Sequence, residues 1–272
     1  MAENSGCTLD ENTRRYYLDA MGIQCWQPLA PAGLQPPVTD RAPASVSGSE
    51  AKPADQSAPE RSVPEKSVPE NPVIDQPLPL AQIIAQCQSC GLHTARRQAL
   101  VDRGDRTSDL AFVLLAPQAD DETAGELCSG EAGELFRKML AAIDVGLDSV
   151  FITTLLKCPV PAGHTVTPAE VAACRGYLEQ QLQVVQPRLV VVLGQSAAQC
   201  LLQKGDSLDA LREAINPATR NSLQAGQSDS PYRFASMPLL VSYSPHELLA
   251  EAQHKRKAWA DLQLLQSLMT QG

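Results

Sequence analysis

The sequence lacks the features that would place the protein in a membrane, in the secretory pathway or tightly on duplex DNA. It contains no stretch of eighteen apolar residues, so a membrane-spanning helix is not expected. Its first residues lack a basic start followed by an apolar core, so no secretory signal is expected. Acidic residues outnumber basic residues by 31 to 22, which argues against strong binding to the DNA backbone through charge alone. We therefore expect a cytoplasmic protein with weak or no direct DNA binding.

The segment 28–79 has almost no aromatic residues, yet it holds twelve of the 21 prolines of the chain. It is rich in Ser, Ala and Glu, and the tetrapeptide S-V-P-E at 62–65 recurs at 67–70. Such a composition cannot bury enough apolar surface to offset the entropy lost on ordering. We expect a disordered linker at 28–79, with a reach of about 40 Å as a flexible coil. It separates a short N-terminal segment, 1–27, from a globular domain, 80–272.

The N-terminal segment carries a cluster of apolar and aromatic side chains. A short helix is expected over 11–21, where one side is apolar, and Gly22 ends it before an extended stretch. The segment is too short to fold alone, so it either packs on the globular domain or docks on another protein. In the second case the partner-binding residues are Tyr17, Leu18, Met21, Ile23 and Trp26.

From residue 80 onward, strand patterns alternate with helix patterns. Strands are expected at 110–115, 150–156, 189–193 and 239–242, and helices at 80–87, 133–143, 167–185, 196–202 and, after an opening at 244, 259–268. The segment 216–230 has the composition of a loop. The alternation predicts an α/β fold of three layers, αβα, around a mostly parallel four-stranded sheet. Ligands of such sheets bind beyond the carboxyl ends of the strands.

Four of the eight cysteines are spaced as a ligand set. Cys87 and Cys90 form a C-x-x-C motif, Cys158 ends the expected strand 150–156, and Cys174 lies in the helix that follows. Disulfides are uncommon in the cytoplasm, whereas four thiols suit zinc or an iron–sulfur cluster, and spacing alone does not choose between these two. The simpler alternative is that Cys158 and Cys174 are only buried. The remaining cysteines are scattered and are expected to be packing residues or exposed thiols: Cys7, Cys25, Cys128 and Cys200.

These motifs occur in the order found in the iron–sulfur (type 4) uracil-DNA glycosylases. The matching segments are 87–90, 114–118, 125–133, 154–158, 167–174, 193–194 and 244–248. From residue 80 to residue 268 the chain therefore resembles that family. The resemblance implies the glycosylase α/β fold and a [4Fe-4S] cluster on the four cysteines, with zinc as the other occupant.

The active-site positions of that family are replaced in this chain. The acidic residue, the glycine after the proline, the stacking phenylalanine, the uracil-binding asparagine and the histidine before a proline correspond to Leu115, Gln118, Cys128, Thr154 and Ser244. Leucine cannot accept a proton or orient water, and cysteine offers no aromatic face. We therefore expect a degenerate pocket that holds no catalytic residue.

Other polar residues near these positions have ordinary local explanations. Ser244 is expected to cap a helix with Glu247 as its capping-box partner. His246 is shifted by two positions from the family's histidine and is expected to point elsewhere. The acidic run Asp120-Asp121-Glu122 is a possible source of a relocated carboxylate, but we expect it to be a solvated face at the start of a loop.

A second resemblance concerns the N-terminal segment. Residues 18–26, L-D-A-M-G-I-Q-C-W, resemble the leading peptide of the psi subunit of bacterial DNA polymerase III. This resemblance implies a psi-like accessory protein whose peptide binds a clamp-loader subunit. Its domain would recruit a chi-like subunit and, through it, single-stranded-DNA-binding protein. We favour this adaptor; the alternatives are a divergent uracil-DNA glycosylase with relocated catalytic groups and a redox-sensing cluster protein.

Overall fold

The structure is a computed structural model that describes residues 78–224 and 231–270. The expected N-terminal helix, the docking residues from Tyr17 to Trp26 and the linker up to residue 77 lie outside these residues. Within the described ranges, no helix is both long and apolar enough to cross a membrane.

Six strands form one sheet in the order β1-β3-β2-β4-β6-β5. The strands are β1 (Asp102–Gly104), β2 (Leu110–Leu114), β3 (Phe151–Thr154), β4 (Leu189–Leu193), β5 (Arg233–Phe234) and β6 (Met237–Ser242). The four central strands, β3, β2, β4 and β6, pair in parallel, which confirms the expected parallel sheet. The expected number of four strands was too small, because antiparallel β1 and β5 are added at the two edges.

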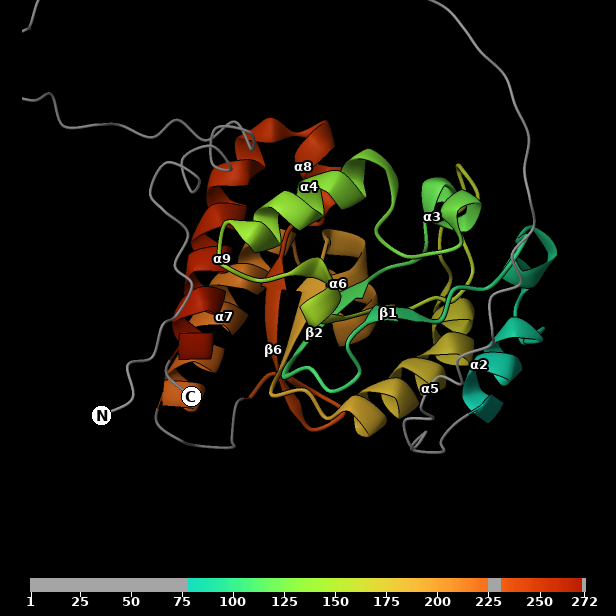
Figure 1. Ribbon diagram of the computed structural model, residues 1–272, viewed down its shortest axis with the longest axis horizontal. Coiled ribbons are helices and arrows are strands. Elements are labelled where there is room, and N and C mark those ends of the chain that lie inside the picture. The colour runs from blue at the N-terminus through green and yellow to red at the C-terminus, as the bar shows by residue number, and fades with distance from the viewer. Residues whose placement is uncertain (1–77, 225–230, 271–272) are drawn as a thin grey trace, which may run out of the picture. The chain divides into compact units, whose positions relative to one another are not determined.

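Helices cover the two faces of the sheet and one of its edges (Figure 1). They are α2 (Leu78–Ala85), α3 (Ala119–Ala124), α4 (Gly130–Ala141), α5 (Pro168–Val185), α6 (Gln195–Leu202), α7 (Leu208–Gln224), α8 (Pro245–Ala250) and α9 (Lys255–Thr270). Three 3-10 turns complete the described chain: η1 (Gly91–Thr94), η2 (Leu147–Ser149) and η3 (Ala252–His254). The expected three-layer arrangement is confirmed.

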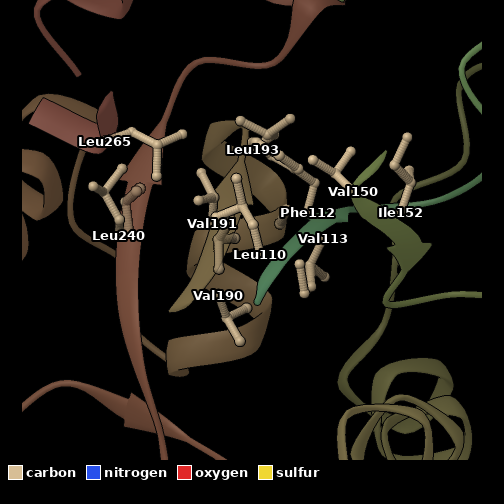
Figure 2. Close-up of a cluster of buried hydrophobic side chains, with 14 of the residues drawn as sticks. Leu110, Phe112, Val113, Val150, Ile152, Val190, Val191, Leu193, Leu240 and Leu265 are labelled. Carbon is tan, nitrogen blue, oxygen red and sulfur yellow. The ribbon is translucent and has the colours of Figure 1, made fainter. Parts of the chain in front are cut away.

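The core lies where the central strands meet the helices. Every residue of β4 is buried, as expected for the middle of a parallel sheet. Phe112 of β2 packs edge-on against Phe136 of α4, with ring centroids 5.1 Å apart. Figure 2 shows that Leu265 of α9 lies beside Leu240 of β6 in the same cluster. The central strands are thus packed between the helices.

Helix α7 covers the edge of β6 and replaces a missing strand partner. The side-chain amide of Asn216 donates to the carbonyl of Val241 at 2.9 Å and accepts from its N–H at 2.9 Å. The hydroxyl of Thr219 donates to the carbonyl of Leu239 at 2.6 Å. These bonds give partners to backbone N–H and carbonyl groups of β6 that the two-residue strand β5 does not reach.

The loop expected at 216–230 was therefore wrong for 216–224, while 225–230 lies outside the described residues. Pro217 lies inside α7, and the contacts of its neighbours Asn216 and Thr219 with β6 hold the helix there. Two smaller differences concern bounds. The strand expected at 150–156 ends at Thr154, and the helix expected from residue 133 begins at Gly130.

Candidate functional site

The carboxyl ends of the parallel strands meet at one end of the sheet, and hydrogen bonds hold the loops that follow them together. Beyond β3, the N–H groups of Leu155 and Leu156 donate to the carbonyls of Leu114 and Leu115, both at 2.8 Å. These hydrogen bonds hold the segment after β3 against the segment after β2. The half-buried side chain of Leu115 packs both on the main core and on the cluster around the cysteines.

The loops after β4 and β6 are joined through Glu247. Its carboxylate accepts from the N–H of Ser244 at 2.9 Å and from the N–H of Gln195 at 2.8 Å. The hydroxyl of Ser244 accepts from the N–H of Glu247 at 3.3 Å, which confirms the expected capping box. Gly194 has a φ of 99°, and a Cβ there would lie 3.1 Å from the Cβ of Ser244. The side chain of Ser244 is therefore engaged in holding the loop after β6 at the start of α8.

Asp121 joins the loop after β2 to the start of α4. Its carboxylate accepts from the N–H of Gln118 at 3.0 Å and from the N–H of Ser129 at 2.7 Å. Burial raises the pKa of Asp121, while these hydrogen bonds and the charge of His246 act to lower it. Asp121 is buried in α3, so the expected solvated loop was wrong for this residue. Gln118, by contrast, is an exposed N-cap.

His246 is exposed on α8 and close enough to Asp121 to act on it electrostatically. Asp120, next to Asp121, is exposed and lies against Gly130, where a Cβ would meet its carboxylate. An imidazole and a carboxylate that do not correspond to the family's catalytic positions are thus present at this end of the sheet.

Thr154 ends β3 with a buried polar atom. The residue is 1% exposed, and its Oγ1 has no hydrogen-bond partner within the described part of the chain. The adjacent Thr153 points to the other face, where its hydroxyl donates to Gln181 of α5 at 2.9 Å. A buried hydroxyl without a partner costs about 1–3 kcal/mol, so its retention requires an explanation.

Cys128 stands at the entrance of α4 in a left-handed backbone conformation, with a φ of 59°. Burial, reinforced by the charge of Asp121, raises the pKa of its thiol to about 12. The thiol is therefore protonated at neutral pH and is a poor nucleophile. Its carbonyl lies so close to Gly133 that a Cβ there would sit 1.9 Å from the oxygen.

The four expected ligand cysteines gather at the other side of the strand ends. Cys158 and Cys174 are buried with Leu92, Ala116 and Leu156, and Cys90 packs against this cluster. All four are free thiols. Burial raises the pKa of both Cys158 and Cys174, and the charge of Cys90 acts to raise both further. The fold thus brings together residues that are separated by up to 87 positions in the sequence.

Hydrogen-bond donors lie against the sulfur atoms of Cys87, Cys158 and Cys174. Arg96 Nη1 donates to Cys158 Sγ at 3.0 Å. The backbone N–H of Lys157 is hydrogen-bonded to Cys174. Although burial acts to raise the pKa of Cys87, hydrogen bonds from Ser89 and Tyr177 lower it. Such donors stabilise thiolates, which are the form that binds a metal.

Four free thiols are a donor set that suits either zinc or an iron–sulfur cluster. Across the described residues, no three His, Cys, Asp or Glu side chains are arranged to hold one metal ion. One tetrahedral zinc, with Zn–S bonds of about 2.3 Å, needs four sulfur atoms packed around one point. An iron–sulfur cluster holds its cysteines around a larger body, and four thiols are its usual ligands.

Lys157 is a buried cation that the sequence did not single out. Its ammonium group donates to Thr153 Oγ1 at 2.7 Å, the Thr154 carbonyl at 2.6 Å and Gln181 Oε1 at 2.5 Å. Burial lowers its pKa to about 7, while Cys174 and Asp102 act to raise it. Its position after an apolar strand was visible in the sequence, but its burial results from α5 covering the sheet.

Comparisons with known proteins bear on this arrangement. A family model described as the uracil DNA glycosylase superfamily matches residues 101–263. The chain is 37% identical over 123 residues to a type-4 uracil-DNA glycosylase of Archaeoglobus fulgidus, covering 45% of this chain and 62% of that relative. It is 35% identical over 124 residues to the type-4 enzyme of Pyrobaculum aerophilum, covering 46% and 63%. The chain thus spans about three fifths of the length of these curated relatives.

Proposed function

Because this chain belongs to the uracil DNA glycosylase superfamily, we propose that its described domain is a divergent DNA glycosylase of base-excision repair. It would bind a DNA base beyond the carboxyl ends of the strands. The names of the two relatives support this function. The observation that carries it is the hydroxyl of Thr154, which is buried there without a partner.

A ligand explains this hydroxyl better than the fold does. A core position next to apolar β-strand residues would be filled as well by valine, which has the same shape and no polar atom. A flipped base presents N–H groups and carbonyls along its edge, and a glycosylase pocket binds them with fixed polar groups. A hydroxyl can either donate or accept, so it would bind such an edge less selectively than an amide.

The base that is bound is not expected to be uracil. Leu115, Cys128 and Ser244 cannot supply the carboxylate, aromatic ring and histidine that uracil excision uses in the family that the sequence resembles. Asp120 and His246 are the groups left to act. The carboxylate would orient the water that attacks the sugar carbon, and the imidazole would stabilise the departing base as it takes the bonding electrons.

Within this proposal, Cys87, Cys90, Cys158 and Cys174 hold a [4Fe-4S] cluster. When bound, the cluster supplies iron–thiolate bonds that tie the segment after α2 to the end of β3 and to α5. The observation in favour is the gathering of four free thiols, three of which accept hydrogen bonds at their sulfur atoms. The protein's own residues position the loops at the strand ends and bind the base.

A second candidate function is a psi-like clamp-loader accessory. Its support is the replacement of all the family's catalytic positions in this chain, together with the N-terminal peptide 13–26, which lies outside the described residues. In this case the domain would recruit a chi-like subunit, and through it single-stranded-DNA-binding protein. The relatives' names support the glycosylase and not this role.

Base release from synthetic DNA tests the first candidate. Single- and double-stranded oligonucleotides with one uracil, hypoxanthine or xanthine would be incubated with wild-type protein, Thr154→Val and Asp120→Asn. We expect uracil release at background and release of another base that falls by about 10²-fold or more in Asp120→Asn. Thr154→Val should weaken substrate binding. Absence of release from every oligonucleotide would overturn the glycosylase and leave the accessory role.

A further inference from the structure

Arg96 makes three contacts that join separate parts of the cysteine site. Its Nη1 donates to Cys158 Sγ at 3.0 Å, and its Nη2 donates to the carbonyls of Ala85 and Cys87, both at 2.8 Å. The side chain is half-buried and follows directly after η1. One guanidinium therefore spans the end of α2, the first ligand cysteine and the ligand cysteine that follows β3.

The geometry uses properties that only arginine has among the cationic residues. The planar guanidinium presents several N–H groups in fixed directions, so that one edge can serve the sulfur and the other the two carbonyls. Ala85 is the last residue of α2, where a positive charge is favourable against the helix dipole. A lysine has a single ammonium group and cannot hold the same three partners in this plane.

We propose that Arg96 is a positioning residue of the cysteine site, which fixes the C-x-x-C segment against Cys158 and stabilises the thiolate of Cys158. The inference rests on the proposed iron–sulfur cluster. Removing a residue that hydrogen-bonds to a metal ligand commonly lowers the metal affinity by about 10–100-fold. Hydrogen bonds to the sulfur atoms of a cluster also withdraw electron density and set its reduction potential. Arg96 thus has an effect on the bound metal that a merely structural arginine would not have.

The chain offers a matched control in the next residue. Arg97 is exposed, and its contact with Glu122 is made by the backbone N–H. Arg97→Gln therefore removes the same charge one position away while keeping that backbone contact. Arg96→Gln removes both the charge and the planar set of N–H donors. Arg96→Lys keeps the charge but removes the planar set of donors.

The experiment compares wild-type full-length protein, Arg96→Gln, Arg96→Lys and Arg97→Gln, all purified without oxygen. Iron per chain, the rate at which a chelator bleaches the cluster and its reduction potential would be measured. We expect bleaching to be about 10-fold faster or more in Arg96→Gln. Its reduction potential should shift to more negative values, whereas Arg97→Gln should match wild type in both.

Each outcome is decisive. If Arg96→Gln does not fold, Arg96→Lys carries the test, with faster bleaching than Arg97→Gln as the expected result. If the Arg96 variants keep wild-type bleaching rates and reduction potential, Arg96 does not position the site and the inference is overturned. If the wild-type protein itself binds no iron, the cluster proposal fails first, and this result is distinct from a failure of Arg96.

Discussion

At the scale of single residues, burial decides which side chains of the strand ends are reactive. Cys128 and Asp121 lie near each other at the entrance of α4, and burial raises the pKa of both. Asp121 nevertheless keeps two backbone N–H donors. For the thiol of Cys128, the charge of Asp121 adds to the effect of burial, and the charge of Arg103 only partly offsets the two.

The first prediction is that Cys128 resists alkylation in the folded protein. A raised pKa of about 12 keeps the thiol protonated throughout pH 7–10, and only the thiolate attacks iodoacetamide. Peptide mapping by mass spectrometry after labelling at several pH values would follow the reaction. The same cysteine in urea-unfolded protein is the control and should react with an ordinary thiol pH profile. Equal labelling rates in the two states would contradict the burial of this thiol.

Residue roles that depend on local chemistry were predictable from the sequence, whereas those that depend on tertiary burial were not. The capping box of Ser244 with Glu247 involves residues three positions apart, and it is confirmed. Asp121 was expected to be solvated, and Lys157 was not singled out. Asp121 is held by the N–H of Ser129 at the start of α4, and Lys157 is covered by Gln181 of α5, so both environments depend on how these helices pack.

At the scale of elements, α7 shows how tertiary contacts override a local signal. Its residues Asn216 and Thr219 bind the backbone of β6, and Asn216 also donates to Asp261 of α9 at 3.1 Å. Arg212 of the same helix donates to both oxygens of Asp261 at 2.7 Å. Helix α7 is therefore fixed to the sheet edge and to α9 by side chains rather than by an apolar face alone.

The second prediction is that Asn216→Ala destabilises the domain by at least ~2 kcal/mol. The substitution leaves the buried N–H and carbonyl of Val241 without their partners, and each such loss costs about 1–3 kcal/mol. Urea unfolding of the protein, followed without oxygen by circular dichroism, would measure it. Asn221→Ala, at an exposed position of the same helix, is the matched control and should change stability by less than about 0.5 kcal/mol. Equal effects of the two substitutions would show that α7 does not seal the edge.

Elements with strong periodicity were predictable, and short elements were not. The four central strands and helix α5 were expected close to their observed places, because buried strands are continuous apolar runs and α5 has a clear start signal. Strands β1 and β5, with three and two residues, are too short for any pattern. Helix α3 was missed because its six residues are mostly polar, and its start depends on Asp121.

At the scale of the whole domain, the cysteine site connects segments that are otherwise separate. The segment with Cys87 and Cys90 precedes the sheet, Cys158 follows β3, and Cys174 belongs to α5. A bound cluster would cross-link all three, and metal binding of this kind is coupled to folding. Losing one ligand is therefore expected to affect the domain and not only a loop.

The third prediction is that Cys158→Ser lowers both the iron content and the melting temperature of the domain. Wild-type protein purified without oxygen should contain about four irons per chain. A loss of about 3 kcal/mol, which is well below the binding free energy of many structural metals, lowers the melting temperature of a domain of this size by roughly 6–12 °C. Cys200→Ser, at a half-buried cysteine outside the site, is the control and should retain iron. Stoichiometric zinc in the anaerobic protein would overturn the iron assignment.

The architecture and the family were within reach of the sequence, but the activity of the site was not. The order of the motifs predicted the glycosylase fold, which the sheet and the family match confirm. The replaced positions pointed to an adaptor, whereas the comparisons favour a glycosylase. The physical reason is that the spacing of the motifs follows from the scaffold, and a scaffold does not by itself determine the chemistry of its site.

The last prediction concerns the accessory role and the N-terminal segment. Tyr17, Leu18, Met21, Ile23 and Trp26 form an apolar cluster in a stretch too short to fold alone. If this cluster binds a clamp-loader subunit, Trp26 is the expected anchor, because large aromatic residues in closed pockets dominate interface energies. Trp26→Ala should then weaken clamp-loader binding by at least ~2 kcal/mol, as measured by calorimetry.

The linker at 28–79 provides the control for this experiment. Because it is expected to separate the segment from the domain, Trp26→Ala should leave the melting temperature of the domain unchanged. A synthetic peptide of residues 8–30 should compete with the full chain for the clamp loader. If Trp26→Ala instead lowers the melting temperature and the peptide binds no clamp-loader subunit, the segment packs on its own domain. The accessory role would then lose its contact with the clamp loader, and the glycosylase would remain as the proposed function of the chain.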